Sequence, residues 1–384
     1  MATRDEIGVA DVKLVALSDQ ILTKVRIWLT GGSLLANAWK VGFFCFALSA
    51  FLYLGGIPGR VTEDIIPLAY HPFDFVVLHS PILARRLTLP IMAHLLHLAN
   101  RGIIVIPIVA NFLTLVLLYY ALALAMPETL AFLTVTLLSL TAMTVIGNTW
   151  LGMPDPISNL MGVACMASTN PMWIAVFAVI GFQTDERFAM MIPFILLWKI
   201  RDCASLKAAA KQSMPFLASI LVALLATGLI QFLVVRDAVP ISIYRHIFVE
   251  AWQQHAAFPL HIPLAIFFAF RWAWWLPIFL AAVAFKSRPK FLAVLTLLLI
   301  ALESLAAMTV ADMTRSMAQI FPGFVLTIYL LAKLRFETLQ RWLPVAIMAM
   351  VVTPILDVWA IVWFLRYPAP VQLLRKLVLE GGGG

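Results

Sequence analysis

Long apolar runs recur along this 384-residue chain and are separated by short polar breaks. A hydrocarbon layer about 30 Å thick needs about 20 apolar residues of helix to cross it. The runs are continuously apolar, whereas the strands of a membrane barrel alternate apolar and polar residues. With 63% apolar and 12% charged residues, a soluble fold of this length could not bury its apolar side chains. The sequence therefore predicts an all-α, polytopic transmembrane helical bundle.

About eleven spans are expected, each helical because backbone polar groups inside a bilayer must be satisfied within the segment. Eight follow directly from apolar runs, at about 41–57, 102–122, 128–147, 215–235, 269–285, 291–310, 317–334 and 343–364. The remaining three fall within 157–200. Basic residues cluster in the short breaks on one side, and the positive-inside rule places that side and the N-terminus in the cytoplasm. Residues 57–101 and 236–268 are then long extracytoplasmic loops.

The predicted transmembrane domain covers 39–380. Residues 1–38 are expected to be cytoplasmic, and apolar side chains at helical spacing over 9–30 indicate an amphipathic helix on the membrane surface, with a short cytosolic helix as the alternative. The four glycines at 381–384 are expected to be an added tail. The net charge of +8 lies in short clusters between apolar runs, which favours acidic lipids over nucleic acid as the partner. No Asn-X-Ser/Thr sequon occurs, in keeping with the expected location in a bacterial inner membrane.

Residues 157–200 allow two topologies. Asn170-Pro171 and the polar run from Thr184 to Arg187 divide the region into three apolar pieces of about 13 residues, each too short to cross an unthinned bilayer alone. One topology has three short helices around a water-filled recess, with the polar run on the outer side. The other has one long helix that puts this run inside. We prefer the first, because polar breaks at membrane depth are tolerated where they line a cavity.

The first outer loop carries the earliest candidates for chemistry. Asp74 could act as a general base toward an acceptor hydroxyl, with His71 beside it as a supporting residue. Arg85 and Arg86 could hold a phosphate, because a guanidinium donates to phosphate oxygens in a fork. The alternative is a solvated loop with ordinary surface ion pairs.

Two further candidates begin predicted helices on the outer side. Asp155 stands before Pro156, which favours an N-cap role, although its carboxylate could also face the recess. Arg315 could bind the phosphate of a lipid carrier, while Asp312 could cap the next helix and orient Arg315. An interfacial salt bridge is the alternative for this second pair.

Histidines suggest a weaker possibility. His94 and His97 stand three residues apart on a predicted helix and would share a face, a spacing that can bind a metal. Amphipathic side chains at the headgroup level are the preferred interpretation, so we expect no cofactor. Glu303 and Asp357 fall within predicted spans, where a carboxylate is costly, and a proton path through them would favour a transporter.

This arrangement resembles the GT-C superfamily of membrane glycosyltransferases, which use polyprenyl-phosphate sugars. Asp74 occupies the first-loop acid position, and Asp185-Glu186-Arg187 followed by Pro193 is similar to the polar break before a later span. Asp312 and Arg315 resemble a late outer acid–arginine motif. The chain departs from the pattern in two ways: Asp74 is not part of a tandem acidic pair, so that Glu63-Asp64 is an alternative equivalent, and no large C-terminal soluble domain follows the spans.

The resemblance implies transfer of a sugar from a polyprenyl-phosphate donor to a glycan, lipid or protein acceptor on the extracytoplasmic side. Asp74, or else Asp64 or Asp155, would deprotonate the acceptor hydroxyl. Arg315, helped by Arg85, Arg86 or Arg187, would stabilise the leaving phosphate, with His71, Asp312 and Glu186 in support. An apolar groove between spans would hold the lipid tail. A transporter or lipid flippase is the first alternative, and a membrane acyltransferase or phosphotransferase is the second.

Overall fold

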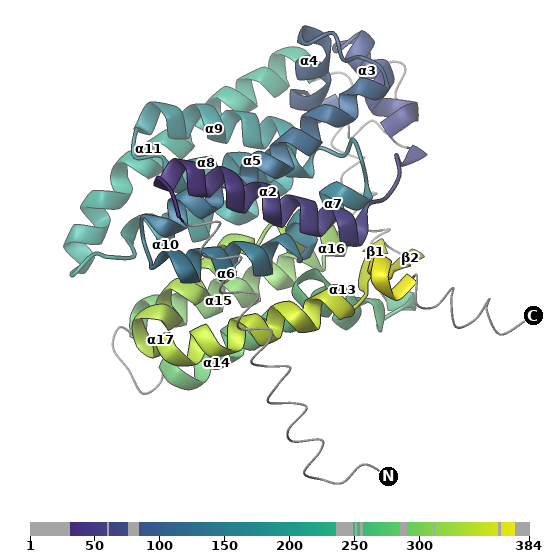
Figure 1. Ribbon diagram of the computed structural model, residues 1–384. Helices are drawn as coiled ribbons and strands as arrows, with labels where there is room; N and C mark the ends of the chain where they lie inside the picture. Colours follow the sequence, from purple (N-terminus) through teal and green to yellow (C-terminus); the bar gives the residue numbers. More distant parts are fainter. Residues whose placement is uncertain are drawn as a thin grey trace, which may run out of the picture.

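A computed structural model describes residues 31–59, 61–75, 84–235, 249, 252–253, 256–284, 290–310, 312–359 and 362–372. Of the residues that the structure describes, 81% are helical, which confirms the predicted all-α class. Figure 1 shows a bundle in which most long helices run in roughly the same direction. The amphipathic helix predicted over 9–30 and the tail at 381–384 lie outside the described residues.

The elements up to residue 200 are α2 (Leu34–Tyr53), the π-helix η1 (Val61–Ile65), α3 (Ile66–Tyr70), α4 (Thr88–Leu95), the 3₁₀-helix η4 (Arg101–Ile104), α5 (Val105–Ala123), α6 (Glu128–Ser139), α7 (Ala142–Thr149), α8 (Asp155–Ala167), α9 (Pro171–Thr184), the 3₁₀-helix η5 (Glu186–Met191) and α10 (Ile192–Ile200). The later elements are α11 (Leu206–Ile230), the π-helix η6 (Gln231–Val235), α13 (His261–Phe270), the 3₁₀-helix η7 (Arg271–Trp274), α14 (Trp275–Ala284), α15 (Lys290–Ala307), α16 (Met313–Ala318), α17 (Phe321–Val352) and the strands β1 (Ile355–Trp359) and β2 (Val362–Arg366).

Several helices are long and apolar enough to cross a membrane, which supports the predicted membrane location. Within the described residues there are five such stretches, or six when α6 and α7 count as one bent span. The five are Leu34–Tyr53, Arg101–Ala123, Leu206–Val235, His261–Ala284 and Met313–Val352. The fourth begins at His261, within the range 236–268 that was predicted to be the second outer loop. Non-helical dihedrals at Arg335 (φ −149°, ψ 56°) divide α17 into two helices.

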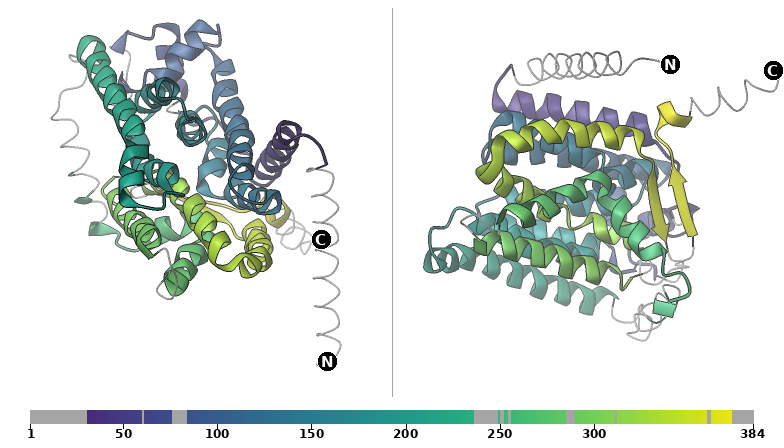
Figure 2. Two further views of the ribbon diagram at one scale, coloured as in Figure 1. Left: turned by 90° about the vertical axis from the view of Figure 1, so that its left-hand side faces the viewer. Right: turned by 90° about the horizontal axis from the view of Figure 1, so that it is seen from below.

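Two predicted spans were wrong in detail. The run at 128–147 is broken, because α6 and α7 meet at an angle of 46°. The run at 343–364 stops at Val352, and an antiparallel hairpin of β1 and β2 follows. Thr353 is extended (φ −84°, ψ 127°) because the proline ring at Pro354 disfavours helical dihedrals in the residue before it. Asp357 therefore lies in a strand and not in a transmembrane helix, and Figure 2 shows the hairpin across one end of the bundle.

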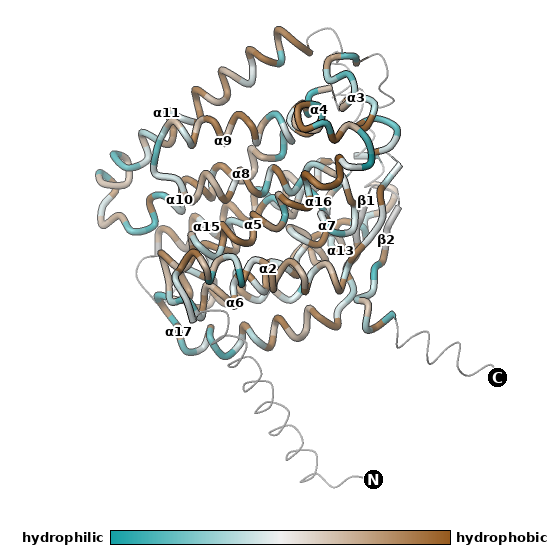
Figure 3. Tube along the Cα trace, turned by 45° about the horizontal axis from the view of Figure 1, so that its top comes forward, coloured by the Kyte–Doolittle hydropathy of each residue, from teal (hydrophilic) through white to brown (hydrophobic). Residues whose placement is uncertain are grey.

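The packing separates buried helices from helices whose apolar residues face outward. All residues of α17 from Phe321 to Leu331 are buried in the main apolar core, together with most of α6 and α7. In contrast, only 22% of the most apolar window of the Leu206–Val235 stretch is buried, and Figure 3 colours α11 mostly as hydrophobic. Exposed apolar surface of this extent marks contact with a membrane or with a partner protein, and lipid fits a helix that is long and apolar enough to span a membrane.

The region 157–200 forms three short helices, α8, α9 and α10, as in the preferred topology. Arg187 Nη2 lies 3.1 Å from Asp155 Oδ1, which joins the end of α9 to the start of α8. At the opposite end, Lys199 Nζ donates to the Met166 carbonyl oxygen at 2.9 Å. The chain therefore reverses direction twice, and the polar run lies at the same end of the bundle as Asp155.

Candidate functional site

Seven charged side chains from four separate stretches of sequence meet at one end of the bundle. We call this set the charge network, and its members are Arg86, Asp155, Asp185, Glu186, Arg187, Asp312 and Arg315. Each stands at or near the end of a helix: before α4, at the start of α8, between α9 and α10, and around the start of α16. In Figure 1, α4 and α16 lie toward the end of the bundle that carries the hairpin.

A tight turn delivers Asp155 to the charge network. Gly152 has φ +92°, a conformation that L side chains rarely adopt, and a Cβ there would lie 2.8 Å from Val61. Asp155 itself is only 4% exposed. The predicted N-cap role is wrong, because Pro154 is the N-cap and no side chain caps α8. The Asp155 carboxylate instead accepts hydrogen bonds from Arg187 and Arg315.

Asp155 is held mainly by Arg315. Arg315 Nε donates to Asp155 Oδ1 at 3.0 Å and Arg315 Nη2 donates to Oδ2 at 2.6 Å, a fork-to-fork pair. The third nitrogen, Arg315 Nη1, donates to Asp312 Oδ2 at 2.6 Å. Asp312 was expected to orient Arg315 and to cap the next helix; it contacts Arg315, whereas its side chain makes no capping hydrogen bond to α16. All three Arg315 nitrogens therefore donate to carboxylates in this arrangement.

Asp185 is the most deeply buried carboxylate of the charge network. It accepts from the backbone N of Arg187 at 3.0 Å, from Arg187 Nε at 2.8 Å and from Arg187 Nη2 at 2.5 Å. Burial alone would raise the pKa of the Asp185 carboxyl, but the guanidiniums of Arg187 and Arg86 lower it below its usual value. The carboxylate is therefore charged at neutral pH and anchors both arginines.

Arg86 connects the first loop to the charge network. Its Nη1 lies 3.3 Å from Asp185 Oδ2, and its Nε and Nη2 donate to the two carboxylate oxygens of Glu186 at 3.3 and 2.7 Å. The Glu186 side chain is 51% exposed, whereas that of Arg86 is 10% exposed. Arg86 and Glu186 therefore form the most accessible edge of the charge network.

One donor and one acceptor at the centre of the charge network have no partner among the described residues. They are Arg187 Nη1 and Asp312 Oδ1, and both atoms are buried. Arg187 Nη1 lies 3.9 Å from the other oxygen of the same carboxylate, Asp312 Oδ2, which is beyond hydrogen-bond distance. An unsatisfied buried donor and an unsatisfied buried acceptor each cost free energy, so each is expected to gain a partner when a polar group binds. A hydroxyl group both accepts and donates hydrogen bonds.

The other candidate residues of the first loop are not members of the charge network. Asp74 and His71 are exposed, in a turn that ends before the stretch left undescribed at 76–83. The Arg85 carbonyl oxygen accepts from Gln231 Nε2 at 3.1 Å, which ties this loop to the end of α11. Asp64, the alternative acid, is buried in η1. Asp155 is buried and the side chain of Asp312 is 19% exposed, whereas Asp74 is exposed.

The predicted histidine pair does not share a helical face. Helix α4 ends at Leu95, and His97 has φ +56°, so the chain has left the helix before the second histidine. His94 Nδ1 lies 3.1 Å from the Ala69 carbonyl oxygen. Within the described ranges, no group of three or more His, Cys, Asp or Glu side chains is placed to hold a metal ion.

A second buried cation, Arg271, was not anticipated from the sequence. It is fully buried with φ +46°, and its Nη1 donates to the Met350 and Thr353 carbonyl oxygens at 2.9 and 2.7 Å and to Tyr53 Oη at 2.8 Å. These acceptors include carbonyls at the C-terminal end of α17, which a helix leaves unsatisfied. Arg271 therefore has a structural role. Its one distinctive feature in the sequence is its position next to a group of tryptophans.

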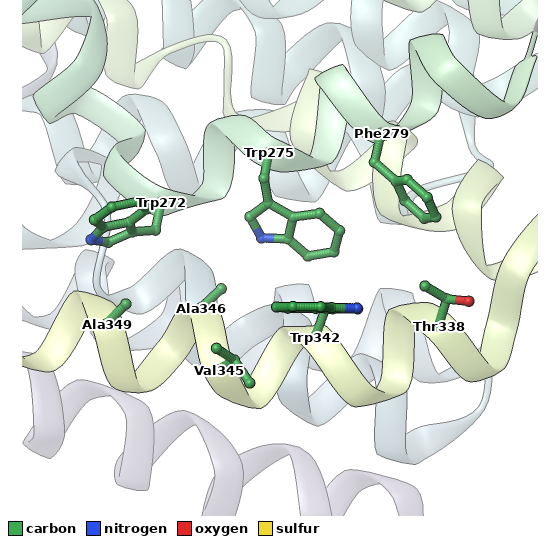
Figure 4. A pocket seen from close by; sticks show the side chains of 8 residues that line it. All are labelled: Trp272, Trp275, Phe279, Thr338, Trp342, Val345, Ala346 and Ala349. Carbon is green, nitrogen blue, oxygen red and sulfur yellow. The ribbon is translucent and has the colours of Figure 1, made fainter.

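An apolar groove of about 500 Å³ runs between η7–α14 and the second half of α17. Its lining residues are Trp272, Trp275, Phe279, Thr338, Trp342, Val345, Ala346 and Ala349. Figure 4 shows the aromatic side chains of one wall facing Trp342 and the small residues of the other. Both walls belong to stretches that can span a membrane, so a lipid chain is the chemically matching occupant.

Comparisons with protein-family models, with curated proteins and with solved structures find no match for this chain. The functional argument therefore depends on the geometry of the charge network and on the sequence features that led to it.

Proposed function

We propose that this protein is a membrane glycosyltransferase of the GT-C type, which transfers a sugar from a polyprenyl-phosphate donor to an acceptor hydroxyl on the extracytoplasmic side. The observation that carries the proposal is the unpartnered pair formed by Arg187 Nη1 and Asp312 Oδ1 in an otherwise saturated ionic network. A hydroxyl bound there accepts a hydrogen bond from the arginine and donates its own proton toward the carboxylate. General-base catalysis requires a carboxylate within hydrogen-bond reach of the hydroxyl, and we propose that Asp312 fills this role.

The chemical step follows from that placement. The acceptor oxygen attacks the anomeric carbon, its proton passes to Asp312 Oδ1, and the bond between the anomeric carbon and the phosphate oxygen breaks. The polyprenyl phosphate leaves as an anion, with inversion at the sugar. Asp312 thus replaces Asp74 as the proposed base. Arg315 and Asp155 act as positioning residues, because Arg315 fixes the other Asp312 oxygen at 2.6 Å and is itself held by Asp155.

The distribution of charge supports an enzyme over a transporter. At the opposite end of the bundle, Asp202 accepts from Lys333 Nζ at 2.6 Å and also interacts with Tyr329. Between this pair and the charge network, the first half of α17 is packed in the apolar core. A transporter needs a polar path that opens to both sides, whereas an enzyme needs its charges at one side only.

The lipid carrier and the topology complete the proposal. The groove between α14 and α17 offers a surface for a polyprenyl chain, at the level of membrane-spanning helices. The pair α6–α7 counts as one crossing, and so do each of the three short helices, α15 and each half of α17. Together with α2, α5, α11 and the stretch formed by α13 and α14, these give about eleven spans. We propose this topology, with a cytoplasmic N-terminus, in a bacterial inner membrane.

A turnover assay tests the proposal. Protein in lipid nanodiscs is given a panel of polyprenyl-phosphate sugars, and released polyprenyl phosphate is measured. Asp312→Asn should reduce kcat at least about 100-fold, the scale of a lost general base, while leaving the binding of the donor within about two-fold. Asp74→Asn should retain activity. Asp202→Asn is the matched control, because it removes the same charge from an ion-paired aspartate at the opposite end of the bundle.

Two results would contradict the proposal. Absence of turnover with every donor by the wild-type protein, when it is folded and loaded with lipid, would remove the glycosyltransferase function. Full activity of Asp312→Asn together with loss of activity in Asp74→Asn would keep the function and return the catalytic role to the first loop.

A further inference from the structure

Glu186 differs from the other carboxylates of the charge network in its exposure. Its side chain is 51% exposed, while those of Asp155, Asp185 and Asp312 are 5%, 0% and 19% exposed. It also begins η5, at the edge of the charge network and not at its centre. Glu186 is therefore the one carboxylate of this set that can turn into solvent without being pulled from a buried site.

The contact that holds Glu186 is of a kind that phosphate also makes. Arg86 Nε and Nη2 donate to its two carboxylate oxygens, so the guanidinium edge is used as a fork. This edge fits carboxylate and phosphate oxygens with nearly the same geometry. Arg86 remains anchored if Glu186 leaves, because its Nη1 lies 3.3 Å from the buried Asp185 carboxylate.

The formal charges of the charge network also favour displacement of Glu186 over displacement of another carboxylate. Without Glu186, the charge network contains three arginines and three aspartates, whose formal charges cancel. Glu186 adds one negative charge to this neutral set. An anion that replaces Glu186 at Arg86 would therefore leave the buried part of the charge network as neutral as before, with the Glu186 carboxylate returned to water.

We propose that Glu186 occupies a phosphate subsite and that the phosphate group of a ligand displaces it from Nε and Nη2 of Arg86. The ligand class is a phosphate monoester or diester anion. The inference deepens the proposed function, because a polyprenyl-phosphate donor would supply this group, and it assigns the phosphate to Arg86 instead of Arg315. Closure of the Arg86–Glu186 pair then marks the empty state of the subsite, and its opening marks the bound state.

The test measures binding of two phosphate probes without turnover. Wild-type protein and variants in nanodiscs are titrated with a polyprenyl phosphate that carries no sugar, and separately with inorganic phosphate. Glu186→Gln removes the competing charge and should bind phosphate about three- to ten-fold more tightly. This gain is expected because the partly exposed ion pair between Arg86 and Glu186, which contributes little free energy, no longer competes with phosphate. Arg86→Lys keeps the positive charge but loses the fork, and should weaken binding at least about ten-fold.

The control is Glu337→Gln, which removes one negative charge from an exposed position on α17, far from the charge network in sequence and in the fold. A gain in affinity for both probes in Glu186→Gln supports the subsite and shows that it recognises phosphate alone. A gain confined to the polyprenyl phosphate supports it and shows that the lipid chain contributes. Equal affinities in wild type, Glu186→Gln and Glu337→Gln would overturn the inference, as would unchanged binding by Arg86→Lys.

This result is separable from the proposed function. Tighter phosphate binding by Glu186→Gln in a protein that turns over no sugar donor would keep the subsite and remove the glycosyltransferase activity. Normal turnover that depends on Asp312, with no change of affinity in Glu186→Gln, would remove the subsite alone.

Discussion

Asp155 and Arg315 are predicted to be strongly coupled in stability. Asp155 accepts three hydrogen bonds from two guanidiniums, two of them from Arg315, and both side chains are almost fully buried. Removing one partner of such a pair leaves an uncompensated buried charge and costs about 3–5 kcal/mol. Asp155→Asn and Arg315→Gln should therefore each lower the free energy of unfolding by about 4 kcal/mol.

The double variant shows whether the two single losses of unfolding free energy are coupled or independent. Once Asp155 is neutral, Arg315 has lost its main partner, so removing Arg315 as well adds little further cost. The double variant should lose about 5 kcal/mol instead of the sum of about 8 kcal/mol, which gives a coupling free energy of about 3 kcal/mol. The measurement is reversible unfolding by SDS titration in mixed micelles, followed by tryptophan fluorescence or circular dichroism.

Asp202 and Lys333 provide a matched control for this cycle. Their side chains are 56% and 50% exposed, and an exposed pair contributes no more than about 1 kcal/mol. Asp202→Asn and Lys333→Gln should thus show little coupling in the same assay. A coupling free energy below about 0.5 kcal/mol for Asp155 and Arg315 would refute the buried fork-to-fork contact.

Three further predictions concern other parts of the structure. Because the pKa of Asp185 is lowered in the folded protein, its stabilising contribution is fully present above the unfolded pKa of about 3.9 and is lost as pH falls from there toward the lowered folded pKa. The melting temperature should therefore begin to fall near about pH 4 and continue to fall at lower pH, and a flat profile in that range would count against the ionic anchoring. Gly152→Ala should destabilise by about 1–3 kcal/mol, since φ +92° and the close Val61 both oppose a Cβ, and an unchanged melting temperature would contradict this turn geometry. Arg271→Ala should cost about 3 kcal/mol, because it removes three buried hydrogen bonds donated by a charged group, although Tyr53 Oη still donates to the Met350 and Thr353 carbonyl oxygens. The loss should be visible as a lowered melting temperature, whereas wild-type stability would show that Arg271 is dispensable.

The sequence predicted the class of the fold and much of the candidate site because both depend on local patterns. Continuous apolar runs predict helices that face lipid, and polar breaks at Asn170 and Asp185 correctly marked the ends of three short helices. Arg86 was selected in the first outer loop, Arg187 in a polar break, and Asp155 and Arg315 at the starts of predicted outer-side helices. The structure brings these four together, which is expected because a charge in this environment needs a partner.

The details that the sequence did not predict depend on contacts between distant segments. Nothing local distinguishes Asp155 as a ligand of Arg315 from Asp155 as an N-cap, since 160 positions separate the pair. The preference for Asp74 rested on loop position and on the resemblance, neither of which reports burial. The span predicted over 343–364 failed for a local reason, because the break at Thr353-Pro354 was hidden within an apolar run that is equally suited to strands.

The most direct test of the central claim is a cryo-EM structure of the protein in nanodiscs with a non-hydrolysable polyprenyl-phosphonate sugar. The account predicts density for the phosphonate at Arg86, with Glu186 displaced, and density for the sugar beside Asp312 and Arg187. An intact charge network with the analogue bound elsewhere on the protein would contradict the account and would leave these seven side chains with a purely structural role.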